Sequence, residues 1–600
     1  MAGSRHRRAV LGQVAIAIAA LAWRAAAQAP DGSAIFARDC AGCHDGAEGS
    51  RAPKPEILKQ RSPEAILAAL TAGGMRPQGA RLTGAERRAV AEYLSGRAPG
   101  GDVTGASKGR CAATPLGSLD ASAAWTGWSP APTNARFQPS AQAGLSAEQV
   151  PRLSLKWAFG FPDATSAWSQ PTVAGGRLFV GSQNGTVYAL DARTGCIHWT
   201  FTAKSGVRTA LIVDASNASL YFGDTGANVY ALDAETGHER WSRALDAHPH
   251  ARITGSPALY QGRLFVPVSS IEETAAGQPG YACCTFRGSL NALDAKSGTV
   301  LWRTFLVPEP KSAGKNAAGL ELWGPAGVGI WSAPTIDVKR NLVYAATGNT
   351  YSAPAQPTAD AIVAFDPPSG AIKWIKQFTE HDVFGCRAGS ANCGEKAGPD
   401  FDIGTPAMLV PSPSGRDVMI VAQKSGMAFA IDPDREGAIL WQYRAGEGSI
   451  WGGLQWGAAV DADRAYFPVS DIRLPKPGGL HAVNLATGER AWYVPPLPLK
   501  CGDPRPGCSA AMISAPTLIP GVLFAGSNDG ALRAFATGDG SIIWEFDTNR
   551  QFETLNGVRA GGGAIQGPGP TIAGGMLYLN SGYGDHLGRP GNVLLAFGID

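Results

Sequence analysis

The chain has 600 residues, a formal net charge of +3 and a charged fraction of 17%. This length exceeds that of an ordinary single domain, so we expect more than one domain. The near-neutral charge gives no electrostatic basis for binding nucleic acid. The chain contains 77 glycines and 43 prolines, which suit many tight turns and argue against long helices.

The N-terminus has the three-part pattern of an export signal. The basic segment RHRR is followed by the apolar segment AVLGQVAIAIAALAW and by the small residues of RAAAQA. This order predicts a secretory signal peptide over residues 1–27, cleaved just after Ala27. A membrane anchor is the alternative, but the apolar stretch is short for a span. We therefore expect a periplasmic protein with no stable membrane span in its mature chain.

A haem-attachment motif follows the predicted cleavage site. Cys40, Cys43 and His44 form CAGCH, in which the two thiols bind haem covalently and the imidazole ligates the iron. Met75 lies in a loop before a predicted helix, in the order typical of small c-type cytochromes. We expect an all-α cytochrome c domain over residues 28–98, with haem c ligated by His44 and Met75. The alternative for Met75 is a core-filling side chain, with water as the second iron ligand.

The next segment separates this domain from the rest of the chain. It contains GRAPGGDVTGASKGR, which is rich in glycine and predicts a flexible linker over residues 99–124. The remaining residues, 125–600, form a second and much larger domain.

One phrase recurs along this second domain: Ala-hydrophobe-Asp-x-x-Thr/Ser-Gly-x-x-x-Trp. Its copies, which vary slightly, end at Trp199, Trp241, Trp302, Trp374, Trp441, Trp492 and Trp544, and a truncated copy starts at Ala596. A repeat of roughly 40 to 70 residues predicts stacked units, because one unit cannot bury its own apolar face. Alternating apolar runs before each copy predict strands, and the Asp-x-x-Thr-Gly segment predicts a turn.

Four such strands per unit, repeated radially, predict a β-propeller. The segment SLKWAFG, around Trp157, is an isolated strand with a tryptophan that precedes the first repeat. It can supply the missing outer strand of the last, truncated unit. We therefore predict an all-β propeller of eight blades.

Eight cysteines lie outside the haem motif. Cys386 and Cys393, like Cys501 and Cys508, are closely spaced in insertions rich in glycine and proline. In an exported protein this spacing predicts disulfides that staple loops. The pair Cys111 and Cys196 follows by elimination, and the adjacent Cys283 and Cys284 either bridge each other or belong to separate bridges. Zinc binding is the competing interpretation, but no CxxC pair accompanies these residues.

The repeat phrase resembles that of the pyrroloquinoline quinone (PQQ) dehydrogenases, which are eight-bladed. The lead-in WTGWSPAPTNARFQPSAQAGLSAEQVPRLSLKWAF resembles theirs, so the resemblance covers residues 125–600. With the N-terminal cytochrome and the segments YACCTFRG and GVRAGGGAIQGPGPTIAGG, the chain most resembles the cytochrome-linked polyvinyl-alcohol dehydrogenases. A propeller alone does not imply a function, so the expected function depends on matched site residues.

The resemblance implies a set of cofactor contacts. Arg208, in GVRTALIV, matches an arginine that binds a PQQ carboxylate, and Thr254, in ITGSP, is a further contact. Gln170, in WSQPTV, stands where the family usually has Glu. Trp331, in VGIWSAPT, matches the aromatic floor under the cofactor and lies outside the repeat's Trp position. Lys424, in IVAQKSG, matches the cation that donates to the quinone oxygens and stabilises negative charge that develops there.

The resemblance also implies a Ca²⁺ site and a catalytic base. FVPVSSIEE places the carboxylate ligand at Glu272, with Glu273 as the alternative, and YAATGNTYSAP places the amide ligand at Asn349. PDFDIGTPAMLV places the catalytic, metal-binding aspartate at Asp400, with Asp402 as its neighbour. A proline here replaces the family's tryptophan, and a cysteine-containing insertion precedes the segment. The alternative for these acids is a role in loops and turns.

Cys283 and Cys284 resemble the vicinal cysteines that many PQQ alcohol dehydrogenases stack on the quinone. Such a ring would oppose Trp331 across the cofactor. The family's ring usually lies one blade earlier than this pair. The alternative is that each cysteine belongs to a different bridge.

The sequence thus predicts a periplasmic enzyme that oxidises alcohols with PQQ and Ca²⁺. Electrons then pass through haem c to an external cytochrome c or another acceptor. The resemblance implies secondary alcohols, polyvinyl alcohol among them, as substrates. The alternatives are a non-enzymatic propeller scaffold, and a sugar or aldehyde dehydrogenase on the same cofactor.

Overall fold

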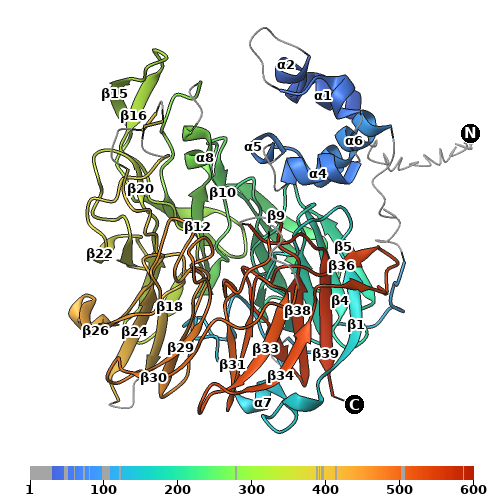
Figure 1. Cartoon of the computed structure of the whole chain (residues 1–600), viewed down its shortest axis with the longest axis vertical. Coiled ribbons are helices and arrows are strands. Elements are labelled where there is room, and N and C mark those ends of the chain that lie inside the picture. Colours follow the sequence, from blue (N-terminus) through green and yellow to red (C-terminus); the bar gives the residue numbers. More distant parts are fainter. Residues whose placement is uncertain are drawn as a thin grey trace, which may run out of the picture.

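The computed structural model describes residues 30–45, 52–59, 61, 63–71, 75–79, 81–96, 108–119, 123–277, 280–386, 389–390, 392–393, 397–411, 415–501, 507–584 and 587–599. The predicted signal peptide lies outside these residues. Figure 1 shows a small helical part placed on one end of a ring of β-sheets. In the described part of the chain, no helix is long and apolar enough to cross a membrane.

The helical part has the elements of the predicted cytochrome domain. It contains α1 (Gly32–Asp39), α2 (Ala41–His44), α3 (Pro55–Leu58), α4 (Pro63–Thr71), α5 (Arg76–Gly79) and α6 (Gly84–Ser95). Asp31 accepts hydrogen bonds from the first turn of α1, and Thr83 with Glu86 forms a capping box on α6. Helices α1, α4 and α6 enclose an apolar core that includes Phe36 and Leu70.

Eight antiparallel sheets form the predicted propeller; seven have four strands each, and the third also includes β10 (Ala251–Arg252) as a fifth strand. Blade 1 contains β2 (Thr172–Ala174), β3 (Arg177–Gly181), β4 (Thr186–Asp191) and β5 (Ile197–Thr202), and blade 2 contains β6 (Ile212–Asp214), β7 (Ser219–Gly223), β8 (Asn228–Asp233) and β9 (Glu239–Ala244). Blade 3 contains β11 (Ala258–Tyr260), β12 (Arg263–Ser270), β13 (Ser289–Asp294) and β14 (Val300–Phe305), and blade 4 contains β18 (Thr335–Asp337), β19 (Leu342–Ala346), β21 (Ala361–Phe365) and β22 (Ile372–Gln377).

The next three blades follow the same order. They contain β23 (Met408–Pro411), β24 (Asp417–Ala422), β25 (Met427–Asp432) and β26 (Ala438–Arg444); β27 (Ala459–Val460), β28 (Arg464–Pro468), β29 (Leu480–Asn484) and β30 (Arg490–Val494); and β31 (Thr517–Ile519), β32 (Val522–Gly526), β33 (Ala531–Ala536) and β34 (Ile542–Asp547).

Blade 8 closes the ring with strands from both ends of the domain. Its order is β1 (Ser154–Gly160), β39 (Val593–Gly598), β38 (Met576–Ser581) and β37 (Thr571–Ala573). Trp157 pairs with Ala596, which starts the truncated repeat. This confirms that SLKWAFG supplies the outer strand of the last blade.

The repeated phrase joins each blade to the next. The Trp199 indole of blade 1 donates to Ala234 O in the corresponding turn of blade 2, at 3.1 Å. Gly237 of that turn has φ +73°, and a Cβ there would lie 2.6 Å from the Trp199 ring. Glycine therefore allows both the turn and the close approach of the tryptophan. Asp191 caps its own turn by accepting from the backbone N–H of Arg193 and Thr194.

Shorter elements decorate the loops. They are α7 (Ser140–Ala143), α8 (Glu272–Ala276), the 3₁₀ turns Val150–Arg152 and Pro433–Arg435, β10 (Ala251–Arg252), which pairs with β12, and the two-stranded pairs β15 (Lys311–Lys315) with β16 (Glu321–Gly324), β17 (Ala326–Gly327) with β20 (Thr350–Ser352), and β35 (Gln551–Phe552) with β36 (Ala560–Gly561). Figure 1 places α8 and β10 at the end of the ring that carries the helical part.

The predicted linker is attached to the propeller along part of its length. Of residues 99–124, the structure describes 108–119, 123 and 124. The disulfide Cys111–Cys196 and a hydrogen bond from Arg177 to Thr114 O fix the first of these stretches to blade 1.

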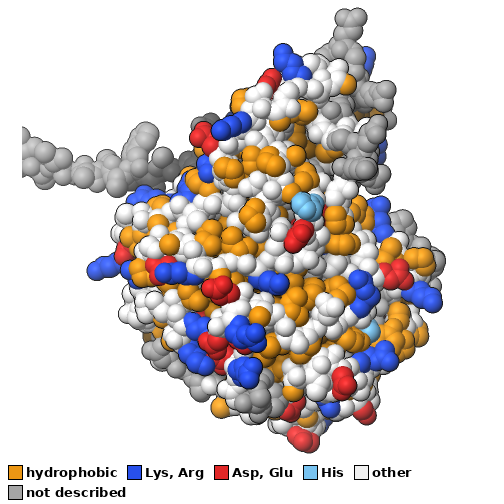
Figure 2. All heavy atoms as spheres, turned by 90° about the vertical axis from the view of Figure 1, so that its left-hand side faces the viewer, with side chains coloured by type: hydrophobic (Ala, Val, Ile, Leu, Met, Phe, Trp, Pro, Cys, Tyr) orange, Lys and Arg blue, Asp and Glu red, His pale blue; other side chains and the backbone are white. Residues whose placement is uncertain are grey.

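On the face shown in Figure 2, basic and acidic side chains are interspersed rather than gathered by sign.

Candidate functional site

A cavity of about 590 Å³ lies among the loops that join the blades. Its wall brings together six residues that the sequence predicts for the site: Arg208, Thr254, Trp331, Asn349, Asp400 and Lys424. They come from loops of different blades, so only the closed ring assembles them. Thr254 is held in place by a hydrogen bond between its Oγ1 and Ser269 Oγ, at 3.0 Å.

Two tryptophans form an aromatic part of the wall. The Trp331 and Trp456 rings meet edge to face, with centroids 5.2 Å apart and planes at 83°. A Cβ at Gly404 would overlap the Trp331 ring, so the indole rests directly on backbone. This support fixes the plane of the ring, which makes Trp331 a suitable stacking face for a flat ligand.

Cationic side chains surround this aromatic wall. The Arg208 guanidinium lies 4.4 Å from the centroid of the Trp456 ring, and Arg208 also donates to the hydroxyl of Tyr583. Arg252, at the end of β10, lines the cavity as well. The Lys424 Nζ lies 5.7 Å from the centroid of the Trp331 ring. Cations around a planar stacking face complement a flat ligand that carries carboxylates.

Lys424 is the centre of a buried ion-pair cluster. Its Nζ lies 3.1 Å from Asp400 Oδ1 and 2.8 Å from Asp402 Oδ2. Burial lowers the pKa of Lys424, but the two carboxylates outweigh burial and raise that pKa above its ordinary value. Burial raises the pKa of Asp400 well above the usual aspartate range, against the opposing effect of Lys424.

The backbone around Asp400 is held in an unusual conformation. Asp400 has φ +58°, a left-handed conformation that a residue with a side chain rarely adopts. The carboxylate of Asp382 accepts hydrogen bonds from the backbone N–H of Asp400 and of Phe401, at 3.2 and 2.8 Å. These contacts turn the Asp400 side chain toward Lys424.

Asn349 presents an oxygen ligand beside this cluster. Its backbone N–H donates to Asp402 Oδ1 at 2.8 Å, and its Nδ2 donates to Phe384 O and Thr350 O. With the amide nitrogen engaged by carbonyls, the amide oxygen is the atom available for a hard cation such as Ca²⁺.

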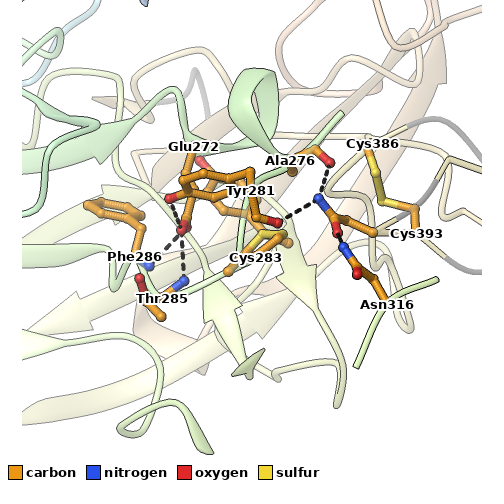
Figure 3. The surroundings of a disulfide bond; sticks show 12 residues. Glu272, Ala276, Tyr281, Cys283, Thr285, Phe286, Asn316, Cys386 and Cys393 are labelled. Atoms are coloured by element: carbon orange, nitrogen blue, oxygen red, sulfur yellow. Dashed lines mark hydrogen bonds between the residues drawn. A yellow bond between two sulfur atoms is a disulfide. The ribbon is translucent and has the colours of Figure 1, made fainter. Parts of the chain in front are cut away.

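The structure places Glu272 outside the cavity wall and Glu273 within it. The Glu272 carboxylate is fully buried and accepts hydrogen bonds from the Tyr281 hydroxyl and from the backbone N–H of Thr285 and Phe286, at 2.8 to 2.9 Å (Figure 3). It also lies 3.4 Å from His248 Nε2. Glu272 thus anchors the start of α8, and the neighbouring Glu273 is the carboxylate that faces the cavity.

The candidate cation site therefore combines Glu273, Asn349 and Asp400. Among the described residues, no group of three or more His, Cys, Asp and Glu side chains is arranged to hold a metal ion. The candidate site has two carboxylates with an amide, and all three residues line the same cavity.

Gln170 also lies outside the cavity wall. Its Oε1 accepts from Arg136 Nη1 at 3.1 Å, and its Nε2 donates to Pro171 O and to Thr571 Oγ1. Arg136 is itself buried and donates to carbonyls of Trp128 and other segments. Gln170 thus ties the lead-in segment to the ring, which differs from the predicted cofactor contact.

Cys283 and Cys284 form a disulfide with each other, but they are absent from the cavity wall. The N–H of Cys284 donates to Trp323 O, and the N–H of Trp323 donates to Cys283 O, so the pair is held against β16. The predicted bridges Cys111–Cys196, Cys386–Cys393 and Cys501–Cys508 are present. Figure 3 shows that Cys386–Cys393 lies close to the loop of Cys283.

The haem-attachment residues lie at α1 and α2. Cys40 is buried and Cys43 is exposed, and neither belongs to the four disulfides of the described chain, as thioether attachment to haem requires. His44 is buried, and its Nδ1 lies 2.7 Å from Pro53 O, a contact that leaves Nε2 for the iron. Met75 packs against the apolar core that includes Cys40.

The wall also contains residues that sequence reasoning missed, among them Arg252 and Trp456. Trp456 lies outside the repeat's Trp position, the signal that also singled out Trp331. Arg252 stands two residues before Thr254, a spacing that places both side chains on one face of an extended segment.

Comparisons with known proteins identify the family. A family model described as Outer membrane protein assembly factor BamB matches residues 154–357, 287–495 and 430–589, and one described as Cytochrome C oxidase, cbb3-type, subunit III matches residues 27–94. Polyvinylalcohol dehydrogenase from Pseudomonas sp. is 41% identical, over 95% of this chain and 94% of that protein. The chain belongs to the polyvinylalcohol dehydrogenase family. The family member from Sphingopyxis sp. (strain 113P3) is 38% identical, over 95% of this chain and 93% of that protein.

Solved structures of lower identity share the fold of this family. Quinohemoprotein alcohol dehydrogenase ADHIIG from Pseudomonas putida HK5 has a TM-score of 0.62 at 18% identity, over 81% of this chain and 83% of that one. Quinohemoprotein alcohol dehydrogenase from Comamonas testosteroni has a TM-score of 0.59 at 19% identity, over 79% and 80%.

Proposed function

We propose that this protein is a periplasmic alcohol dehydrogenase that uses PQQ, Ca²⁺ and a covalently bound haem c. One observation carries the proposal: Lys424, Asp400 and Trp331 line one cavity in a chain that also contains a haem-attachment motif. Family membership supports the same activity, because the two relatives of nearly equal length are both named polyvinylalcohol dehydrogenase.

The cavity fits PQQ, a flat tricarboxylate with an ortho-quinone. Trp331 offers the stacking face, and Arg208 and Arg252 offer cations for the carboxylates. Glu273 and Asn349 offer hard oxygen ligands for Ca²⁺ at the cavity wall. When bound, PQQ supplies the quinone that accepts a hydride from the alcohol carbon, and Ca²⁺ polarises that quinone.

The chain's own residues then supply the proton chemistry. Asp400 accepts the proton of the substrate hydroxyl on a carboxylate oxygen, as a general base. Burial raises the pKa of Asp400, and Lys424 at 3.1 Å opposes that effect, as a bound cation would. The Lys424 Nζ also lies 5.7 Å from the centroid of the Trp331 ring, where its positive charge would stabilise negative charge that develops on a ligand stacked there.

The proposed substrates are secondary alcohols, polyvinyl alcohol included. The cavity wall contains apolar side chains, among them Ile450, Trp451 and Phe384, which suit a hydrocarbon chain bearing hydroxyl groups. Cys40, Cys43, His44 and Met75 would hold the haem, which would supply one-electron transfer to an external cytochrome c or another acceptor.

PQQ binding to the purified protein tests the proposal. Quenching of tryptophan fluorescence should report binding that depends on Ca²⁺, because Trp331 and Trp456 line the cavity. Glu273→Gln should weaken the Ca²⁺ dependence. A protein that binds no PQQ in the presence of Ca²⁺ would contradict the proposal and favour a scaffold. If the protein binds PQQ but oxidises only sugars or aldehydes, the proposed substrate class is wrong.

A further inference from the structure

The helical domain meets the propeller in a close contact at blade 1. A Cβ at Gly84, the first residue of α6, would overlap the carbonyl oxygen of Asn184 in the loop between β3 and β4. Beside it, Arg88 forms an ion pair with Asp163 of the propeller, with Nη1 and Oδ1 2.5 Å apart. The side chains of Arg88 and Asp163 are only 11% and 7% exposed, so this pair is largely excluded from solvent.

Arg87 connects this contact to the predicted haem ligand. The buried Arg87 guanidinium donates to Gly79 O and Leu82 O in its own domain, at 3.0 and 2.9 Å, and to Gln183 O of blade 1, at 2.8 Å. Gly79 N–H in turn donates to Met75 O at 2.8 Å. One side chain therefore joins the turn that carries Met75 to the propeller.

A second set of contacts continues from Gln183 to the cavity. Gln183 Oε1 accepts from the backbone N–H of Thr165 and Ser166, at 2.7 and 3.2 Å. Two residues further on, the Trp168 indole donates to Val207 O at 3.1 Å, and its ring centroid lies 5.7 Å from the Arg208 guanidinium. Arg208 lines the cavity. Bonded and hydrogen-bonded atoms thus connect Met75 with the cavity wall without a gap.

We propose that Arg87 is a positioning residue that docks the Met75 side of the haem domain on blade 1, and that this contact, with Gln183 and Trp168, is the electron route from the cavity to the haem. The inference rests on the proposed function. Each alcohol loses two electrons and two protons. The electrons cross one at a time, each reduces one Fe(III) to Fe(II), an external acceptor reoxidises the iron, and both protons pass to water.

The test uses the full-length holoprotein in stopped flow, with two readouts for each variant. One is the rate at which alcohol reduces the haem, followed by its absorbance. The other is turnover with a small dye that takes electrons directly from the reduced quinone. Arg87→Met keeps the volume and removes the donors, and Gly84→Val pushes the two domains apart. Arg38→Gln is the matched control, since Arg38 is exposed and pairs with Asp39 and Glu86 of its own domain.

A third readout needs no quinone cofactor. Hydrogen exchange at residues 182–186 in the haem-loaded protein reports whether the helical domain stays docked. Arg87→Met and Gly84→Val should increase exchange there, while Arg38→Gln should not. Arg87→Lys, which keeps one donor, should restore part of the protection, which separates docking from a general loss of folding.

We expect haem reduction in Arg87→Met to slow by about tenfold or more, because small displacements of reacting partners have large rate effects. Dye-linked turnover should stay at the unmodified level. The inference is overturned if haem reduction keeps its rate while exchange shows that the domains have separated, or if both rates fall together. Unmodified protein whose haem no alcohol reduces, although docking is intact, would refute the proposed function instead.

Discussion

Removing the Lys424 ammonium isolates the charge chemistry of the cavity. Lys424 compensates two buried carboxylates, Asp400 at 3.1 Å and Asp402 at 2.8 Å, so Lys424→Met leaves both without a counter-charge. Breaking a buried pair in this way costs about 3 to 5 kcal/mol of folding stability. Loss of a donor aimed at developing negative charge costs roughly 100- to 1,000-fold in kcat.

The assay is steady-state alcohol oxidation with a dye acceptor, together with thermal unfolding of the protein without PQQ. We expect Lys424→Met to lower kcat far more than it changes KM, and to lower the melting temperature. Lys424→Arg keeps the charge and should recover most of the stability but less of the rate, because a planar guanidinium does not reproduce the ammonium geometry. A Lys424→Met protein with near-normal kcat would refute the assigned role.

Three further outcomes follow from the geometry. Glu273→Gln should weaken Ca²⁺-dependent PQQ binding, whereas Glu272→Gln should mainly lower thermal stability; equal loss of Ca²⁺ dependence in both variants would contradict the assignment. Burial lowers the pKa of His481 to about 4, so between pH 6.5 and 4 the unfolded chain binds a proton at His481 that the folded chain does not bind. The free energy of unfolding should therefore fall as the pH drops through this range, by up to about 3 kcal/mol. His481→Phe should flatten that slope in thermal melts, and an unchanged slope would show that other groups cause it. Gly237→Ala should destabilise by about 1 to 3 kcal/mol in denaturant unfolding, because its Cβ would press on Trp199, whereas Gly538→Ala, with open space around it, should not.

The fold could be predicted because its determinants are local and repeated. Each copy of the phrase contains its own turn, its own glycine and its own tryptophan, and the tryptophan acts on the next blade. The strand around Trp157 could be placed for the same reason, because it supplies the outer strand that the last repeat lacks. The vicinal bridge of Cys283 and Cys284 was one of two alternatives that the sequence left open, and its location against β16 was not predicted.

The site was less predictable because side-chain direction depends on where elements end. β12 ends at Ser270 and α8 begins at Glu272, so a shift of one residue decides which of two adjacent glutamates faces the cavity. Gln170 is directed away from the expected contact by Arg136, a residue of the lead-in segment that lies beside it only in three dimensions. Arg252 and Trp456 reach the cavity wall only because the blades close into a ring, and no local sequence pattern indicates this.

The proposed function is tested most directly by a visible spectrum of the purified protein before and after addition of polyvinyl alcohol or a simple secondary alcohol. The proposed function predicts that the haem bands change to the reduced form only when PQQ and Ca²⁺ are both present, and that Asp400→Asn abolishes the change. Reduction without PQQ, or an oxidised spectrum with every component present, would contradict it.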